Sequence, residues 1–119
     1  MAPRCLIVDD SPAFLQAASH LLEREGLAVV GCASTTDEAL KLARDMTPDV
    51  ILVDIFLGRE SGFDLARDLA AVGTQATVIL ISTHSEAEFA DLIAEAPAAG
   101  FVPKSELSAS AIEELAGAG

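Results

Sequence analysis

Aromatic residues are scarce in this chain of 119 residues: five are Phe, and none is Trp or Tyr. Aliphatic side chains must therefore fill most of any core, and hydrophobic residues do make up 51% of the sequence. So large an apolar share excludes a disordered chain. The length suffices to bury a core without disulfides or a structural metal, so we expect a single domain over residues 1–119.

Basic residues are also few, with seven Lys and Arg against nineteen Asp and Glu and a formal net charge of −12. This charge argues against a domain that grips nucleic acid or an anionic membrane by itself, because both surfaces are negative. The acid excess could serve solubility alone, or part of it could form a cation site.

Long apolar runs are missing too. No stretch approaches the roughly 18–20 apolar residues of a membrane span, and the short run before Asp9 does not have the pattern of a signal peptide. The two cysteines, Cys5 and Cys32, do not have metal-ligand spacing. We expect a cytoplasmic protein in which both are small core residues, one opening the first strand and the other closing the second.

Four short apolar runs each lead into reactive side chains. Residues 5–8 precede Asp9 and Asp10, residues 50–53 precede Asp54, residues 78–81 precede Ser82, and residues 101–103 precede Lys104. Such runs are typical of strands buried on both faces of a sheet. Ligands of open parallel α/β sheets bind outside the carboxyl ends of the strands, so these groups should meet at one edge. They indicate a site for a metal and a phosphoryl group.

Helical signals alternate with the strands. Capping patterns and apolar stripes predict helices from Ser11-Pro12 to Gly26, from Thr35 to Thr47, over 61–72, from Ser85 to Pro97 and over 108–116, with a second strand at 27–31 and a polar loop at 58–62. The fourth helix should bury Phe89, Leu92, Ile93 and Ala96. The pattern is (βα)5, which predicts a doubly wound α/β fold: a parallel sheet between two helical layers.

The acidic pair Asp9-Asp10 could cap the first helix, since acids favour helix amino termini. Ser11 already fits that role, however, and two charges about 4 Å apart repel by roughly 4 kcal/mol at an effective dielectric near 20. Asp54 adds to this repulsion at the same edge. A divalent cation would relieve it, and Mg²⁺ prefers carboxylates together with a phosphate oxygen.

Three further side chains have alternative roles. Asp54 could be a third metal ligand or a nucleophile toward phosphorus, a known covalent route. Ser82 could cap a helix, but Ser85 fits that role better and leaves the Ser82 hydroxyl for a phosphoryl oxygen. Lys104 could be an ordinary surface lysine, or could pair with Asp54 or a phosphate.

These residues together resemble a response-regulator receiver domain of two-component signalling over residues 5–116. The motifs that carry the resemblance are Asp9-Asp10, Pro48-Asp49 leading into Asp54, Ser61-Gly62, Ser82, and residues 100–104 ending in Lys104. The resemblance implies a flavodoxin-like fold with strand order 2-1-3-4-5. It also implies that Asp54 accepts the phosphoryl group, while Ser82 and Lys104 hold the phosphoryl oxygens.

The resemblance further implies a Mg²⁺ cofactor on Asp9, Asp10, Asp54 and the backbone carbonyl of Phe56. Phe101 falls at the family's aromatic switch position, although it could be only a core strand residue. Thr83 and His84 follow Ser82 where the family's side chains influence phosphate lifetime, although His84 could be merely exposed. The chain departs from the family at Leu57-Gly58, where a proline is usual.

The implied function is a switch phosphorylated by a histidine kinase or phosphotransfer protein that docks near the first helix. Output would pass to a fused DNA-binding domain or a protein partner, with a homodimer as a further expectation and residues 117–119 as the start of a linker. Alternatives are a phosphorylation-independent binding module, an aspartate-nucleophile phosphatase of the haloacid dehalogenase type, and a flavodoxin-like flavin carrier. The receiver would catalyse only its own phosphorylation and dephosphorylation.

Overall fold

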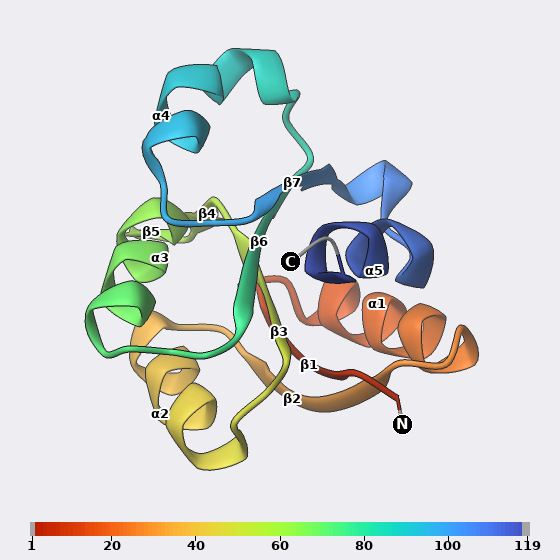
Figure 1. Ribbon diagram of the computed structural model, residues 1–119. Helices are drawn as coiled ribbons and strands as arrows, with labels where there is room; N and C mark the ends of the chain where they lie inside the picture. Colours follow the sequence, from red (N-terminus) through yellow and green to blue (C-terminus); the bar gives the residue numbers. More distant parts are fainter. Residues whose placement is uncertain (1, 118–119) are drawn as a thin grey trace.

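A five-stranded parallel sheet runs through the centre of the molecule in the computed structural model, which describes residues 2–117 (Figure 1). Its strands are β1 (Arg4–Val8), β2 (Ala28–Ala33), β3 (Val50–Asp54), β6 (Thr77–Ser82) and β7 (Gly100–Pro103). The spatial order is β2-β1-β3-β6-β7, and every neighbouring pair is parallel. Counting only these five strands, the order is 2-1-3-4-5, so the predicted fold class and strand order are confirmed.

Helices cover both faces of this sheet. The helical elements are α1 (Pro12–Arg24), α2 (Thr36–Met46), α3 (Gly62–Ala71), η1 (Glu86–Phe89), α4 (Ala90–Glu95), η2 (Lys104–Glu106) and α5 (Ala109–Gly117), where η marks a 3-10 helix. Figure 1 shows α1 and α5 on one face and α2, α3 and α4 on the other. None of the described helices is long and apolar enough to cross a membrane.

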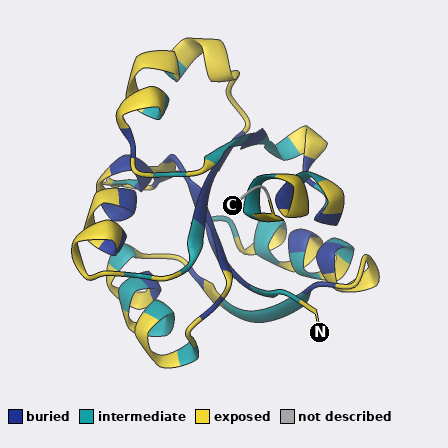
Figure 2. Ribbon diagram, in the orientation of Figure 1, coloured by how far each residue is buried: buried dark blue, intermediate teal, exposed yellow. Residues whose placement is uncertain are grey.

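The core lies in two layers because alternate residues of each strand point to opposite faces. Leu6 and Ile51 face the layer under α2 and α3, whereas Ile7 and Leu52 face the layer under α1 and α5. All five residues of β3 are buried, which explains its nearly unbroken apolar sequence (Figure 2).

The first two helices begin as their sequences predict. The Ser11 hydroxyl accepts the Phe14 N–H at the start of α1, with Pro12 at the first helical position. Thr35 accepts the Glu38 N–H in the same way at the start of α2. Gly26, just after α1, has φ +99°, a conformation that residues with a Cβ rarely adopt.

The segment after β3 differs from the predicted polar loop. It forms a small antiparallel hairpin of β4 (Phe56–Leu57) and β5 (Glu60–Ser61), and Gly58 turns the chain with φ +63°. Two-residue strands are too short to show a periodicity, so the sequence pattern could not reveal them. Leu57 and Gly58, which stand where the family usually has a proline, belong to this hairpin.

The predicted helix beginning at Ser85 is wrong in its start and only partly right in its packing. The chain forms η1 before α4, and Ser85 caps neither element with its side chain; its hydroxyl instead donates to the Glu88 carboxylate. No side chain of η1 or α4 is fully buried, and Leu92 is 47% exposed. Of the predicted stripe Ala96, beyond the end of α4, is buried, and Phe89 and Ile93 are half-buried and pack against the core under α2 and α3, so this segment is attached by a partly exposed face (Figure 2).

The prediction for the cysteines is half wrong. Cys5 is buried, and burial raises the pKa of its thiol to about 12, but Cys32 is exposed because β2 is an edge strand. Cys5 lies near the start of β1, and Cys32, which pairs in register with Ile7, lies near the end of β2. The predicted linker also differs: Gly117 belongs to α5, and residues 118–119 lie outside the described residues.

Candidate functional site

The carboxyl ends of β1, β3, β6 and β7 bring Asp9, Asp54, Ser82 and Lys104 to one edge of the sheet. Asp9, Asp54 and Ser82 are the buried polar or charged residues among residues 2–117, with exposed fractions of 0%, 6% and 1%. Burying such groups costs free energy unless they are paired. Their gathering at one edge therefore marks the candidate site.

Lys104 holds the two buried carboxylates together. Its Nζ lies 2.5 Å from Asp9 Oδ2 and 3.0 Å from Asp54 Oδ2, and its side chain is only 13% exposed. Burial alone would lower the pKa of Lys104, but its contacts with Asp9 and Asp54 outweigh burial and raise it. The lysine is therefore a permanent cation of the site, and not an ordinary surface residue.

Asp54 is held at both of its carboxylate oxygens. Oδ1 accepts the Phe56 N–H at 3.1 Å, and Oδ2 accepts a hydrogen bond from Lys104. Burial nevertheless raises the pKa of Asp54, and the contacts with Phe56 and Lys104 offset this only in part. A fixed, poorly solvated carboxylate with one oxygen beside an ammonium is well placed for nucleophilic chemistry.

Three carboxylates could hold a cation here. One oxygen from each of Asp9, Asp10 and Asp54 lies within 4.8 Å of the others. Asp9 Oδ1 accepts the Ser11 N–H at 2.8 Å, and its fully buried Oδ2 is paired with the Lys104 ammonium. One lysine cannot neutralise three carboxylates, and an all-oxygen donor set of this kind suits Mg²⁺.

The hairpin after β3 closes over the same carboxylates. A Cβ on Gly58 would lie 3.6 Å from Asp10 Oδ2, so this turn approaches the acidic pair directly. Gly62, which opens α3, packs even closer: a Cβ there would lie 2.0 Å from the backbone oxygen of Asp54. Only glycine fits at position 62, because the backbones of β3 and α3 touch there.

Ser82 is not as free as the sequence suggested. Its Oγ accepts the His84 N–H at 2.9 Å, which closes a turn over the exposed Thr83. The hydroxyl proton remains available, since a serine can accept and donate at once. Ser82 could thus donate to an oxygen on Asp54 without breaking this turn.

Three rings that the sequence did not single out as a group join the two loops beside the site. The centroids of Phe56, His84 and Phe89 lie 5.1–5.6 Å apart in edge-to-face pairs, and Phe56 is 45% exposed. Phe56 and His84 each lie two residues beyond a strand of the main sheet, whereas Phe89 ends η1, so no sequence pattern groups the three. Phe101, the predicted switch residue, is half-buried and packs against the core under α2 and α3.

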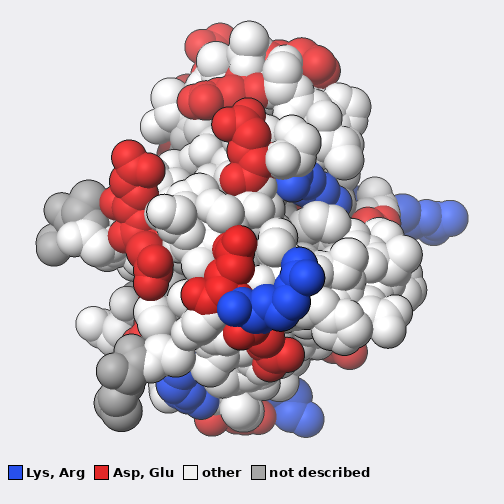
Figure 3. Space-filling view, turned by 90° about the vertical axis from the view of Figure 1, so that its right-hand side faces the viewer, with Lys and Arg blue, Asp and Glu red and all other residues white. Residues whose placement is uncertain are grey.

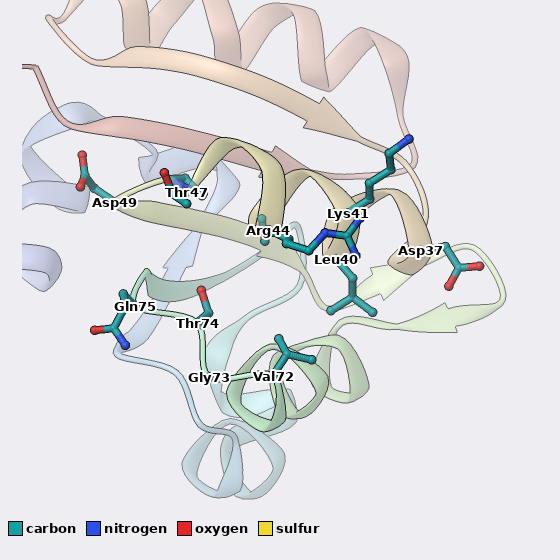
Figure 4. A pocket seen from close by; sticks show the side chains of 12 residues that line it. Asp37, Leu40, Lys41, Arg44, Thr47, Asp49, Val72, Gly73, Thr74 and Gln75 are labelled. Atoms are coloured by element: carbon teal, nitrogen blue, oxygen red, sulfur yellow. The ribbon is translucent and has the colours of Figure 1, made fainter.

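A cavity of about 710 Å³ lies away from these residues, at the amino-terminal edge of β3 and β6. Leu40 of α2 and Val72 beyond α3 point toward each other across it (Figure 4). Lys41 and Arg44 are balanced there by Asp37 and Asp49. The cavity contributes nothing to the candidate site.

Comparison with known proteins gives concordant matches. Residues 5–116 match the family described as "Response regulator receiver domain". The response regulator GacA of Pseudomonas aeruginosa is 32% identical over 102 residues, which cover 85% of this chain and 48% of GacA. The chain thus spans about half the length of the curated relatives it matches.

Solved structures agree with these matches. A two-component response regulator of the LuxR family from Aurantimonas sp. SI85-9A1 superposes with a TM-score of 0.89 and 31% identity, covering 99% of this chain and 87% of that chain. A response regulator from Burkholderia pseudomallei, solved with a phosphorylated aspartic acid, a calcium ion and citrate, gives a TM-score of 0.82 and 29% identity over 95% of this chain and 66% of that chain.

Proposed function

Because this chain belongs to the response regulator receiver domain family, we propose that it is a switch that accepts a phosphoryl group on Asp54. The observation that carries the proposal is the pairing of this buried carboxylate with Lys104 at 3.0 Å, beside Asp9 at the same strand edge. The donor is a histidine kinase or a phosphotransfer protein, and the Burkholderia pseudomallei relative with a phosphorylated aspartic acid supports an aspartyl acceptor.

The transfer forms one bond and breaks one. An oxygen of Asp54 forms a bond to phosphorus while the bond from phosphorus to the donor's histidine nitrogen breaks, and that nitrogen keeps the electron pair. Asp54 is fixed for this attack by the Phe56 N–H, and Lys104 neutralises charge on the phosphoryl oxygens. Asp9, Asp10, Asp54 and the Phe56 carbonyl would hold Mg²⁺, which supplies further neutralisation of that charge when bound.

The phosphoryl group then changes the loop after β6. Ser82 donates its hydroxyl proton to a phosphoryl oxygen and keeps its bond from the His84 N–H, so the turn through Thr83 moves with it. The rings of His84, Phe56 and Phe89 are carried along, and the face near Phe101 shifts. A full switch requires about 5.5 kcal/mol of differential interaction between the two states. One hydrogen bond to a charged group contributes only roughly 1.5–3 kcal/mol, so several of these contacts must change together.

The names of longer relatives indicate what kind of output reads the switch. BvgA of Bordetella pertussis, which is about twice as long as the part it shares with this chain, is named as a positive transcription regulator of virulence factors. We therefore propose that a fused DNA-binding domain or a protein partner reads the switch, with a homodimer of the receiver as one form of output.

The test is the intact mass of the chain after incubation with Mg²⁺ and acetyl phosphate. We expect one phosphoryl adduct that requires Mg²⁺, disappears in Asp54→Asn and persists in Asp45→Asn, which alters an exposed acid on α2. Undiminished labelling of Asp54→Asn would refute the proposal. No adduct would favour a phosphorylation-independent binding module, and repeated turnover of a phosphomonoester would favour a phosphatase.

A further inference from the structure

The aromatic ring of Phe14 lies against the charged end of Lys104. The Nζ atom is 4.2 Å from the ring centroid, although the two residues come from different elements, the first turn of α1 and the start of η2. The Ser11 cap fixes the backbone of Phe14, and its half-buried ring packs against the core under α1 and α5. The Phe14 side chain is therefore fixed at its backbone by the cap and at its ring by the core.

This contact completes the surroundings of the ammonium group. Two sides of Nζ face Asp9 and Asp54, and the Phe14 ring occupies another. A ring face attracts a cation through its quadrupole, most strongly where water is excluded, and the Lys104 side chain is only 13% exposed. Unlike a carboxylate, the ring adds no charge that a phosphoryl oxygen would have to displace.

We propose that Phe14 is a positioning residue, whose ring holds the Lys104 ammonium beside Asp54 so that it meets the incoming phosphoryl oxygens. This inference rests on the proposed function, since it assigns Phe14 a part in the same transfer. The long lysine side chain otherwise has many rotamers, and fixing its charged end in advance removes an ordering cost from the transition state.

A role in packing alone makes a different prediction. A merely apolar requirement at position 14 is met by Leu or Met, whereas holding a cation requires a ring face. We expect Phe14→Leu and Phe14→Met to slow phosphorylation by acetyl phosphate roughly three- to thirtyfold. This is the rate change that corresponds to losing the free energy of a cation–π interaction from the transition state. Phe14→Tyr should retain a rate near that of the wild type, and Phe63→Leu, which removes a core ring on the other sheet face, is the matched control.

The second measurement needs no phosphoryl group. The chain has only two lysines, so the Hε protons of Lys104 can be compared by NMR with those of the exposed Lys41. Protons above a ring face are shifted upfield; we expect this shift for Lys104 in the wild type and in Phe14→Tyr, and its loss in Phe14→Leu.

The two measurements separate the outcomes. Equal rates in Phe14→Leu and Phe14→Tyr, or a Lys104 signal at the position of Lys41 in the wild type, would overturn the positioning role while leaving the switch intact. A wild-type chain that takes up no phosphoryl group would remove the proposed function, and the role of Phe14 in transfer with it, even if the NMR shift is present.

Discussion

The carboxylate of Glu60 accepts both donors of Thr36, the backbone N–H at 2.9 Å and the hydroxyl at 2.7 Å. These bonds fasten the β4–β5 hairpin to the first turn of α2, where a negative charge is favoured by the helix dipole. They also lower the pKa of Glu60, chiefly through the Thr36 N–H. The hairpin carries the Phe56 carbonyl, one of the proposed Mg²⁺ ligands. The Glu60–Thr36 bonds, which we call the clamp, hold the hairpin in place although it lacks the proline usual at Leu57-Gly58.

Glu60→Gln should weaken Mg²⁺ binding, because the hairpin loses its charged anchor. We expect a dissociation constant raised by no more than about fivefold, since Glu60 is exposed and solvent screens the contact. Glu38→Gln is the control, because that carboxylate bonds Ser34 and Thr35, away from the hairpin. Equal Mg²⁺ titrations for both variants would show that the clamp does not support the metal ligands.

Asp54→Asn should stabilise the fold at neutral pH. Burial raises the pKa of Asp54, so the folded chain holds the proton more tightly than the unfolded chain does. The contribution of Asp54 to stability is thus fully present below its ordinary pKa of 3.8 and is lost as pH rises through the raised value. Urea unfolding across pH should show a higher free energy of unfolding for the variant than for the wild type at neutral pH, and no difference in acid. A lower free energy of unfolding for the variant at neutral pH would contradict this assignment.

Lys104→Met should destabilise the fold by about 3 kcal/mol or more without Mg²⁺, because Asp9 and Asp54 are left buried without a cation. Added Mg²⁺ should then stabilise the variant more than it stabilises the wild type, since the ion replaces the missing charge. Thermal unfolding with and without Mg²⁺ measures both effects. Lys41→Met removes the other, exposed lysine and should change neither stability nor its Mg²⁺ dependence.

Gly62→Ala should lower the free energy of unfolding by about 3 kcal/mol or more. The new Cβ would lie 2.0 Å from the backbone oxygen of Asp54 and 2.8 Å from Ile55 Cα. Both are backbone atoms, so relief requires a shift of β3 or α3, and phosphorylation of Asp54 should slow as well. Gly31→Ala is the comparison: its Cβ would meet only the side chains of Leu6 and Leu42, at 3.4 Å and beyond. Chemical denaturation that gave equal stabilities for the two variants would argue against this close contact.

The η1–α4 segment should contribute little to stability. Leu92→Ala is expected to cost less than about 1 kcal/mol, as at an ordinary surface position, whereas Leu69→Ala in α3 should cost about 2–5 kcal/mol. Amide hydrogens of α4 should also exchange faster than those of α3. Strong protection across residues 90–95 would show that the segment is anchored more firmly than its burial indicates.

The strand-end residues could be predicted because β3 and its neighbours are buried on both faces. That burial demands continuous apolar runs, so the first polar side chain after each run, such as Asp54 or Ser82, stands out in the sequence. The loops could not be predicted in the same way. The Glu60 clamp joins residues 24 positions apart, and the contact of Phe14 with Lys104 joins residues still farther apart, so neither leaves a local pattern.

The α4 surface is free to diverge. Several acidic groups lie among uncharged residues at the top of the molecule in Figure 3, where η1 and α4 lie, and Glu86, Glu88, Asp91 and Glu95 are all exposed. Since the core scarcely depends on these positions, selection on folding scarcely constrains them. The charge and shape of this face can therefore change without loss of the strand-end residues. The same fold and site could thus be combined with different binding surfaces.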